Sequence, residues 1–321
     1  MGRRGGPTIT IGDVDVRPGS VHRVDLPVAR LPTGTWETLP IQVINGWEDG
    51  PLLWTSGAIH GDELNGIEIV REVVAQLDPR TLRGALIAVP IVNVFGLLTG
   101  ERTLPDRRDL NRSFPGSPRG SFAARVAHLF LTTIANRCGY GIDFHTGSHH
   151  RDNLAQVRAQ LADPETRRIA EAFGAPIMID ARTRDGSLRE VASRAGSHVL
   201  LFEGGEALRF DPDVIRLGVA GTLRVLAALG MIDGPDRPPV PSRTSSASTW
   251  VRARRSGIVR LFVEPGDEVA RGAQIGEISD AFREDVVHVR AATSGLVVGL
   301  SRNPLANQGD GLVHIAELDD A

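Results

Sequence analysis

Two histidines and two glutamates that lie far apart in the sequence have the residue types of a catalytic metal centre. Three apolar stretches end directly before a residue that can bind a metal or a proton, namely His60, His145 and Glu203. Ligands bind at the carboxyl ends of the strands in an open α/β sheet, so we expect these three side chains to meet there. Glu63 follows His60 by three residues, and Gly61 between them allows a tight turn that points both side chains at one ion.

The combination of His60, Glu63 and His145 is the ligand set of a catalytic zinc ion, which keeps a fourth position for water. Bound zinc lowers the pKa of that water to about 7. Glu203 would then take the proton and pass it to a leaving nitrogen. Each residue taken alone is more often structural, so the prediction depends on the set. Glu206, three residues after Glu203, is an alternative for the same role.

Four other polar residues neighbour these positions. Asp62 and Asp143 are each within two residues of an expected ligand, and a carboxylate there could orient a histidine ring by a hydrogen bond. His149 and His150 follow a loop that contains glycine, and we expect them in solvent rather than on the metal.

The segment 101–116 contains four arginines within eleven residues. Such a run is usually a solvated surface, but this one follows a buried stretch, and Leu110 and Phe114 should anchor it. An anchored arginine can bind a substrate carboxylate through two parallel hydrogen bonds. Another can polarise a carbonyl group and stabilise the negative charge that develops on its oxygen.

The composition excludes several kinds of chemistry. All 36 basic residues of the 321 are arginine, so no lysine is available for a Schiff base, a phosphate-binding loop or a lipoyl or biotinyl arm. The net charge of −3 leaves no basic surface that calls for nucleic acid or an anionic membrane. Cys138 is the single cysteine, no apolar stretch of signal-peptide type follows the N-terminus, and no run is long enough to span a membrane. We therefore expect a cytoplasmic protein.

Strand-like and helix-like stretches alternate through the first three quarters of the chain, which favours an α/β sheet with helices on both faces, that is, three layers. The expected strands cover 51–58, 85–92, 141–144 and 199–202, the second being followed by a loop up to residue 100. The expected helices cover 122–135, 164–173 and 212–229, and apolar residues at helical spacing indicate another between 67 and 77.

A stretch rich in proline and serine, 236–249, predicts a linker. It would separate a catalytic domain, 1–235, whose first 48 residues we interpret as an N-terminal extension with strands, from a C-terminal module, 250–321. The module consists of two similar hairpin units with Gly-Asp turns, which indicates a small all-β fold. It resembles the lipoyl/biotinyl-type barrel-sandwich, but it lacks the carrier lysine, so we interpret it as structural or as a lid over the active site.

Four motifs together carry a family resemblance: His60-Gly61-Asp62-Glu63, Asp109-Leu110-Asn111-Arg112-Ser113-Phe114-Pro115-Gly116, Asp143-Phe144-His145-Thr146-Gly147 and Phe202-Glu203-Gly204-Gly205. They resemble the succinylglutamate desuccinylase/aspartoacylase family, a branch of the zinc carboxypeptidase fold. The likeness covers about residues 50 to 230, and the C-terminal module is similar to one carried by bacterial members.

The resemblance implies one zinc ion per chain on His60, Glu63 and His145, with Glu203 as the base that activates water. It implies that Asn111 and Arg112 bind a substrate carboxylate or polar group. Arg102 most resembles the arginine that polarises the scissile carbonyl, and Arg107 and Arg108 stay open for that role. The segment Arg151-Asp152-Asn153-Leu154 looks like one that lines the pocket in bacterial members, so Arg151 and Asn153 are candidates for substrate binding.

We therefore expect a zinc-dependent amidohydrolase that removes the acyl group from a small N-acyl amino acid or related amine. The chain has one tyrosine, Tyr140, in a position that we interpret as structural, so we do not expect recognition by tyrosine hydroxyl groups. A metallocarboxypeptidase acting on peptides is the alternative, and a binding protein that kept the fold is a third hypothesis. An accessory β module favours self-association into a homo-oligomer.

Overall fold

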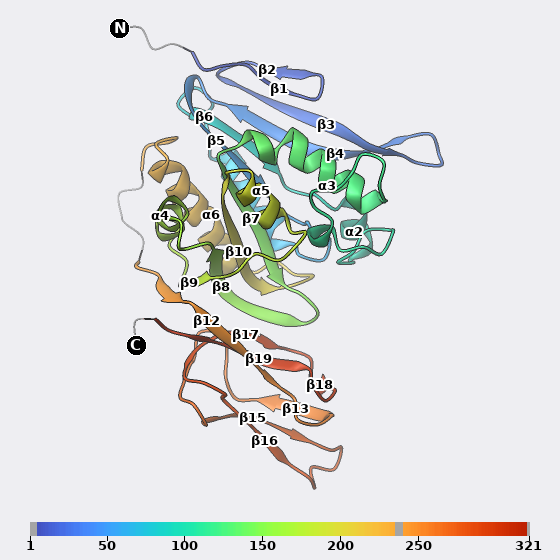
Figure 1. Cartoon of the computed structure of the whole chain (residues 1–321), viewed down its shortest axis with the longest axis vertical. Coiled ribbons are helices and arrows are strands. Elements are labelled where there is room, and N and C mark those ends of the chain that lie inside the picture. Colours follow the sequence, from blue (N-terminus) through green and yellow to red (C-terminus); the bar gives the residue numbers. More distant parts are fainter. Residues whose placement is uncertain (1–4, 235–239, 320–321) are drawn as a thin grey trace.

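The computed structural model describes residues 5–234 and 240–319, and within these ranges one large mixed sheet organises the protein (Figure 1). Its strands lie in the order β12-β19-β17-β8-β10-β7-β5-β6-β4-β3. The central strands β10, β7, β5 and β6 are parallel, whereas β8 and β4 on either side run antiparallel to their neighbours. The predicted α/β sheet is therefore confirmed, with antiparallel flanks.

The strands that precede the C-terminal module are β1 (Ile9–Ile11), β2 (Val14–Val16), β3 (Ser20–Arg30), β4 (Trp36–Asn45), β5 (Glu48–Ser56), β6 (Arg83–Val89), β7 (Tyr140–Gly147), β8 (Arg151–Ala159), β9 (Ile177–Asp180) and β10 (His198–Glu206). The helices are α1 (Asn65–Ala75), α2 (Val94–Thr99), α3 (Phe122–Thr133), α4 (Pro164–Phe173), α5 (Leu188–Arg194) and α6 (Pro212–Ala228), with short 3₁₀ turns η1 (Leu110–Arg112) and η2 (Ala135–Arg137).

Helices cover both faces of the sheet and form two separate apolar cores. On one face α1, α4 and α6 bury residues such as Val70, Phe173 and Val225 against the sheet. On the other face α3 and α5 pack residues such as Phe130 and Leu188 against Trp54. The expected three layers are thus present, and the buried sheet holds the strand ends in fixed positions.

The helix starts follow local sequence rules. Asp163 and Asp211 cap α4 and α6 by accepting hydrogen bonds from backbone N–H groups, and each precedes a proline at the first helical position. The stretch before residue 100 differs from expectation, because α2 occupies part of the predicted loop. Asn93 caps this helix by accepting a hydrogen bond from the Gly96 N–H group, a signal that the apolar character of the stretch concealed.

The C-terminal module consists of two packed sheets around their own apolar core. Its strands are β11 (Arg243–Ser245), β12 (Ala247–Arg252), β13 (Gly257–Leu261), β14 (Glu268–Val269), β15 (Gln274–Ser279), β16 (Val287–Arg290), β17 (Gly295–Ser301), β18 (Leu305–Ala306) and β19 (Gly311–Glu317). Strand β17 pairs antiparallel with β8, so the sheet of the first domain continues into the module. In Figure 1 the module (orange to red) lies at the end of that sheet.

Part of the predicted linker 236–249 is strand. Residues 235–239 lie outside the described residues, but β11 pairs with the edge of β9, and β12 begins at Ala247. Serine, threonine and arginine can form strand here because they keep their backbone N–H groups, and β9 offers an edge with which they pair. Within the described ranges, no helix combines the length and the apolar character that crossing a membrane requires.

Candidate metal centre and active-site pocket

His60, Glu63 and His145 lie together, and their side chains are buried. One nitrogen of each histidine and one carboxylate oxygen of Glu63 are within 4.8 Å of one another. The Nδ1 atom of His60 lies 2.8 Å from Glu63 Oε1, and the Nδ1 atom of His145 lies 2.7 Å from Glu63 Oε2. Both histidine rings therefore direct their Nδ1 atoms toward the Glu63 carboxylate.

The connection after β5 explains how His60 and Glu63 reach that point. The chain turns between them, with the Glu63 N–H group donating to the His60 carbonyl at 3.1 Å. A side chain at Gly61 would place its Cβ 1.9 Å from the Gly96 backbone in α2. Glycine is thus required at this position because the turn packs directly on that helix.

Two carboxylates hold the outer nitrogens of the histidine rings. Asp143 Oδ2 lies 2.9 Å from His145 Nε2, and Asp109 Oδ1 lies 3.2 Å from His60 Nε2. Such contacts fix the ring orientation and raise the basicity of the nitrogen that faces a metal. Asp143 thus takes the orienting position considered from the sequence, whereas Asp62 does not. Its Oδ1 is buried, and no hydrogen-bond partner for it lies in the described part of the chain.

Charge in this cluster is strongly coupled. Burial alone would raise the pKa of the Glu63 carboxyl, but the two histidines beside it hold that pKa well below its usual range. Burial alone would lower the pKa of His145, but the carboxylates of Asp143 and Glu63 hold it well above its usual range. The Glu63 carboxylate is therefore favoured in its ionised form, which is the form that binds a metal ion.

The register of the parallel strands brings Glu203 beside this centre. Glu203 on β10 is paired with His145 on β7, and residues paired in this way project from the same face of the sheet. Its Oε2 atom accepts a hydrogen bond from Asn153 Nδ2 at 2.9 Å and lies 3.5 Å from Arg158 Nε. Glu206 lies elsewhere, in an ion pair with Arg209, and does not line this cavity.

The arginine-rich segment contributes two of its four arginines to the site. Arg102 donates to Glu63 Oε1 and to Asp109 Oδ2, both at 3.0 Å, and it lies against the metal ligands. Arg112 also lines the pocket, whereas Arg107 and Arg108 do not. Asn111 accepts a hydrogen bond from the Leu188 N–H group on its Oδ1 atom and also lines the pocket.

The two other candidates for substrate binding lie in the same cavity, whereas His149, His150 and Tyr140 lie outside it. Arg151 and Asn153 both line the pocket, although the Asn153 amide group points its donor at Glu203. His149 and His150 are exposed, in keeping with their expected place in solvent. The Tyr140 hydroxyl group donates to Glu165 and takes no part in the pocket.

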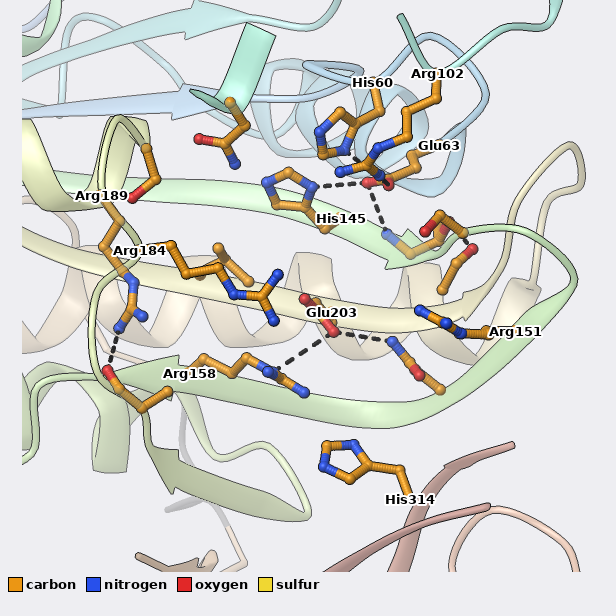
Figure 2. Close-up of a pocket in the computed structure, with 18 of the residues that line it drawn as sticks. His60, Glu63, Arg102, His145, Arg151, Arg158, Arg184, Arg189, Glu203 and His314 are labelled. Atoms are coloured by element: carbon orange, nitrogen blue, oxygen red, sulfur yellow. Dashed lines mark hydrogen bonds and ion pairs between the residues drawn. The ribbon is translucent and has the colours of Figure 1, made fainter. Parts of the chain in front are cut away.

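These residues surround a cavity of about 370 Å³ (Figure 2). In this view the two histidines, Glu63 and Arg102 lie on one side, His314 and Arg158 lie on the other, and Glu203 lies between them. In the described part of the chain, seven arginines and two glutamates line the cavity; the arginines are Arg102, Arg112, Arg151, Arg158, Arg182, Arg184 and Arg189. The site is therefore strongly positive.

Sequence reasoning missed several of these residues. The sequence motifs assigned no role to Asp109. No sequence pattern indicated that four further arginines, Arg158, Arg182, Arg184 and Arg189, belong to the site. Arg158 and Arg189 lie on β8 and α5, two elements that the sequence pattern did not predict, so no sequence signal identified them. Burial lowers the pKa of Arg189 to about 10, and its guanidinium group donates to two backbone carbonyls.

The C-terminal module supplies one wall of the pocket through Ser248, Trp250 and His314. The ring of His314 stacks on Trp250 with 4.7 Å between the centroids, and its Nε2 atom lies 2.9 Å from Ser248 Oγ. The guanidinium group of Arg151 lies over the Trp250 ring, 4.9 Å from its centroid. The module thus contributes directly to the pocket, as one of the two roles expected for it from the sequence would require.

Comparisons with known proteins agree on one relationship. The model of the succinylglutamate desuccinylase/aspartoacylase catalytic domain matches residues 49–229. The N-alpha-acetyl-L-2,4-diaminobutyric acid deacetylase of Halomonas elongata is 29% identical over 294 residues, which are 87% of this chain and 86% of that protein.

Solved structures give the same picture. A succinylglutamate desuccinylase/aspartoacylase from Rhodobacter sphaeroides is 28% identical, with a TM-score of 0.82 over 93% of this chain and 95% of that chain. The product-bound ectoine utilization protein EutE (DoeB) from Ruegeria pomeroyi is 25% identical, with a TM-score of 0.85 over 98% of this chain and 99% of that chain.

Proposed function

The chain belongs to the succinylglutamate desuccinylase/aspartoacylase family and is a deacylase of N-acyl amino compounds, and we propose that it is a zinc enzyme that hydrolyses a small N-acyl amino acid. The observation that carries the proposal is the buried triad of His60, Glu63 and His145 at one side of a cavity that also contains Glu203.

The donor set fits zinc. Two imidazole nitrogens and one carboxylate are the protein ligands of catalytic zinc sites, and the triad here converges with its outer nitrogens already held by Asp109 and Asp143. Zinc bound there would polarise the substrate carbonyl and increase the acidity of a water molecule.

Glu203 is the base that takes the proton from the attacking water and delivers it to the leaving nitrogen. Both of its contacts, with Asn153 and with Arg158, are made by the Oε2 atom. The Oε1 atom accepts no hydrogen bond from the described residues, so it is available for the proton. A carboxylate held in this way is oriented before the substrate arrives, which favours general acid–base catalysis.

Arg102 stabilises the negative charge that develops on the carbonyl oxygen. Its guanidinium group already lies against Glu63 and Asp109, and it is the only one of the three arginines considered from the sequence that lines the described pocket. Asn111 is fixed through its Oδ1 atom by the Leu188 N–H group. With Arg112 beside it, it binds the substrate carboxylate.

The charge of the pocket favours an anionic substrate. Among the described residues, five of the seven pocket arginines have no carboxylate at ion-pair distance; the exceptions are Arg102 and Arg158. Positive charges that lack partners in a partly enclosed cavity repel one another, and an anion removes that repulsion. We propose that the substrate carries a second carboxylate, in the acyl group or in the amino acid side chain, rather than a free ammonium group.

The experiment is a hydrolysis screen with the purified, zinc-loaded protein. Its arms are N-acetyl amino acids with acidic, neutral and basic side chains, N-succinyl amino acids, and peptides with free carboxyl termini. We expect turnover of N-acyl amino acids, with the highest kcat/KM in an arm that carries a second carboxylate. Equal kcat/KM for substrates with and without a second carboxylate, whether in the acyl group or in the side chain, would refute the charge argument. Preferential cleavage of peptides would refute the deacylase assignment. The Glu203→Gln variant should retain zinc and lose about 10²- to 10⁴-fold in kcat.

A further inference from the structure

A row of cross-strand neighbours runs from the C-terminal module into the active site. Trp250 on β12 is paired with His314 on β19, His314 is paired with Gly299 on β17, and Gly299 is paired with Asn153 on β8. Asn153 then donates its side-chain hydrogen bond to Glu203 on β10. The row places a glycine of the module directly beside the residue that holds the carboxylate of Glu203.

The missing side chain at Gly299 makes room for the Asn153 amide group. A Cβ atom on Gly299 would lie 2.5 Å from Asn153 Oδ1, closer than non-bonded atoms approach. The φ angle of Gly299 is not among the positive ones, so its backbone conformation is open to any residue. The glycine is therefore required for space beside Asn153 and not for the fold of the strand.

The local backbone has a feature that fixes this arrangement. Strand β17 has a bulge between Val297 and Gly299, and the extra residue, Val298, accepts a hydrogen bond on its carbonyl from Gln156 Nε2 at 2.9 Å. Bulges change the direction in which neighbouring residues point and often lie next to active sites. Here the bulge brings Gly299 opposite both His314 and Asn153.

We propose that the C-terminal module orients Glu203 through Gly299, which acts with Asn153 as a positioning pair. This inference rests on the proposed role of Glu203 as the base. It gives Asn153 a task that differs from substrate binding, because its donor group is engaged by Glu203. It also gives the module a role in the reaction in addition to lining the pocket.

A Gly299→Ala substitution should lower the activity and leave the fold intact. The atom that must move is the end of a flexible side chain, so the strand keeps its pairing at little cost in stability. Moving the amide group breaks its hydrogen bond with Glu203, and a catalytic group displaced by about 1 Å can lose on the order of 10²-fold in rate.

The experiment is a double-mutant cycle of Gly299→Ala and Asn153→Ala in the full-length, zinc-loaded protein, with kcat, KM, zinc content and melting temperature measured for each variant. We expect each single variant to lose roughly 10- to 100-fold in kcat with little change in KM or zinc content. The double variant should be no slower than Asn153→Ala, because the two residues act through the same contact. Gly139→Ala is the matched control, since a Cβ at that exposed glycine would meet no atom within 4 Å.

Three results would overturn the inference: an unchanged kcat in either single variant, losses that multiply in the double variant, or an Asn153→Ala variant that changes KM alone. A crystal structure of Gly299→Ala tests the geometry without activity, and an intact hydrogen bond between Asn153 and Glu203 there would also refute it. Full activity of Glu203→Gln would instead refute the proposed function, while the crystal structure would still test the positioning.

Discussion

The ring of His314 should make the stability of the protein depend on pH in a way that one substitution removes. Burial, together with the positive charges of three pocket arginines, Arg158, Arg151 and Arg184, lowers the pKa of His314 from 6.5 to about 3. Its neighbours on the module, Trp250 and Ser248, carry no charge. These two neighbours therefore offer the protonated ring no negative charge.

The magnitude follows from the difference between the folded and unfolded states. The unfolded chain binds a proton at His314 near pH 6.5, whereas the folded protein binds it only near pH 3. Between these values the unfolded state holds more protons, so stability falls as the pH falls, by about 1.4 kcal/mol per pH unit. At about pH 5, His314 should therefore have removed roughly 2 kcal/mol from the free energy of unfolding, and at about pH 8 it should remove almost nothing.

The assay is urea unfolding of the metal-free protein at about pH 8 and about pH 5, for the wild type and His314→Gln. Glutamine stays uncharged, so the loss of stability between the two pH values should be smaller in the variant by roughly 2 kcal/mol. Loss of the stacking contact lowers stability equally at both pH values and cancels in this comparison. The exposed His149→Gln variant should behave like the wild type. Equal pH dependence in the wild type and His314→Gln would refute the reasoning.

Two further predictions concern substrate and metal. Arg112→Ala should raise KM for substrates with a carboxylate by about 10-fold or more, because a charge-assisted hydrogen bond is lost, and an unchanged KM would place the carboxylate site elsewhere. Asp143→Asn should weaken zinc binding about 10- to 100-fold, measured by competition with a chelator, because His145 loses the carboxylate that orients its ring. The same zinc affinity in Asp143→Asn and the wild type would refute this role of the Asp143 carboxylate.

Regular elements with strong local signals were predictable. Helix α4 has the bounds expected from the sequence, Pro164–Phe173, because an aspartate cap, a proline at the first turn and a glycine after the last turn all agree. The buried strands that lead to His60, His145 and Glu203 were also predicted, since continuous apolar runs are typical of central parallel strands, although β5 ends at Ser56 and β7 and β10 continue past His145 and Glu203. Strand β8 was missed because its residues alternate weakly and include several charges.

Predictions that depended on long-range contacts fared less well. Asp62 looked as suitable as Asp143 for orienting a histidine, and only the turn after His60 decides that it makes no such contact. The strand pairing of residues 243–245, inside the predicted linker 236–249, could not be read from composition, because it depends on the free edge of β9. The contribution of Trp250 and His314 to the pocket depends on the pairing of β17 with β8, which joins segments about 150 residues apart.

The sequence by itself determined the kind of chemistry. The chain has no lysine, and two histidines and a glutamate follow its expected strands. The carboxyl ends of parallel strands meet at one edge of a sheet, so these side chains are expected to come together. Metal binding is the main function of such a set of ligands. The tertiary structure alone decided what surrounds the metal centre. The register of β10 on β7 sets Glu203 beside His145, and the continuation of the sheet through β17 brings Gly299 and His314 to the same pocket. Pairing between distant strands follows from packing over the whole sheet, and for that reason no local pattern specifies it.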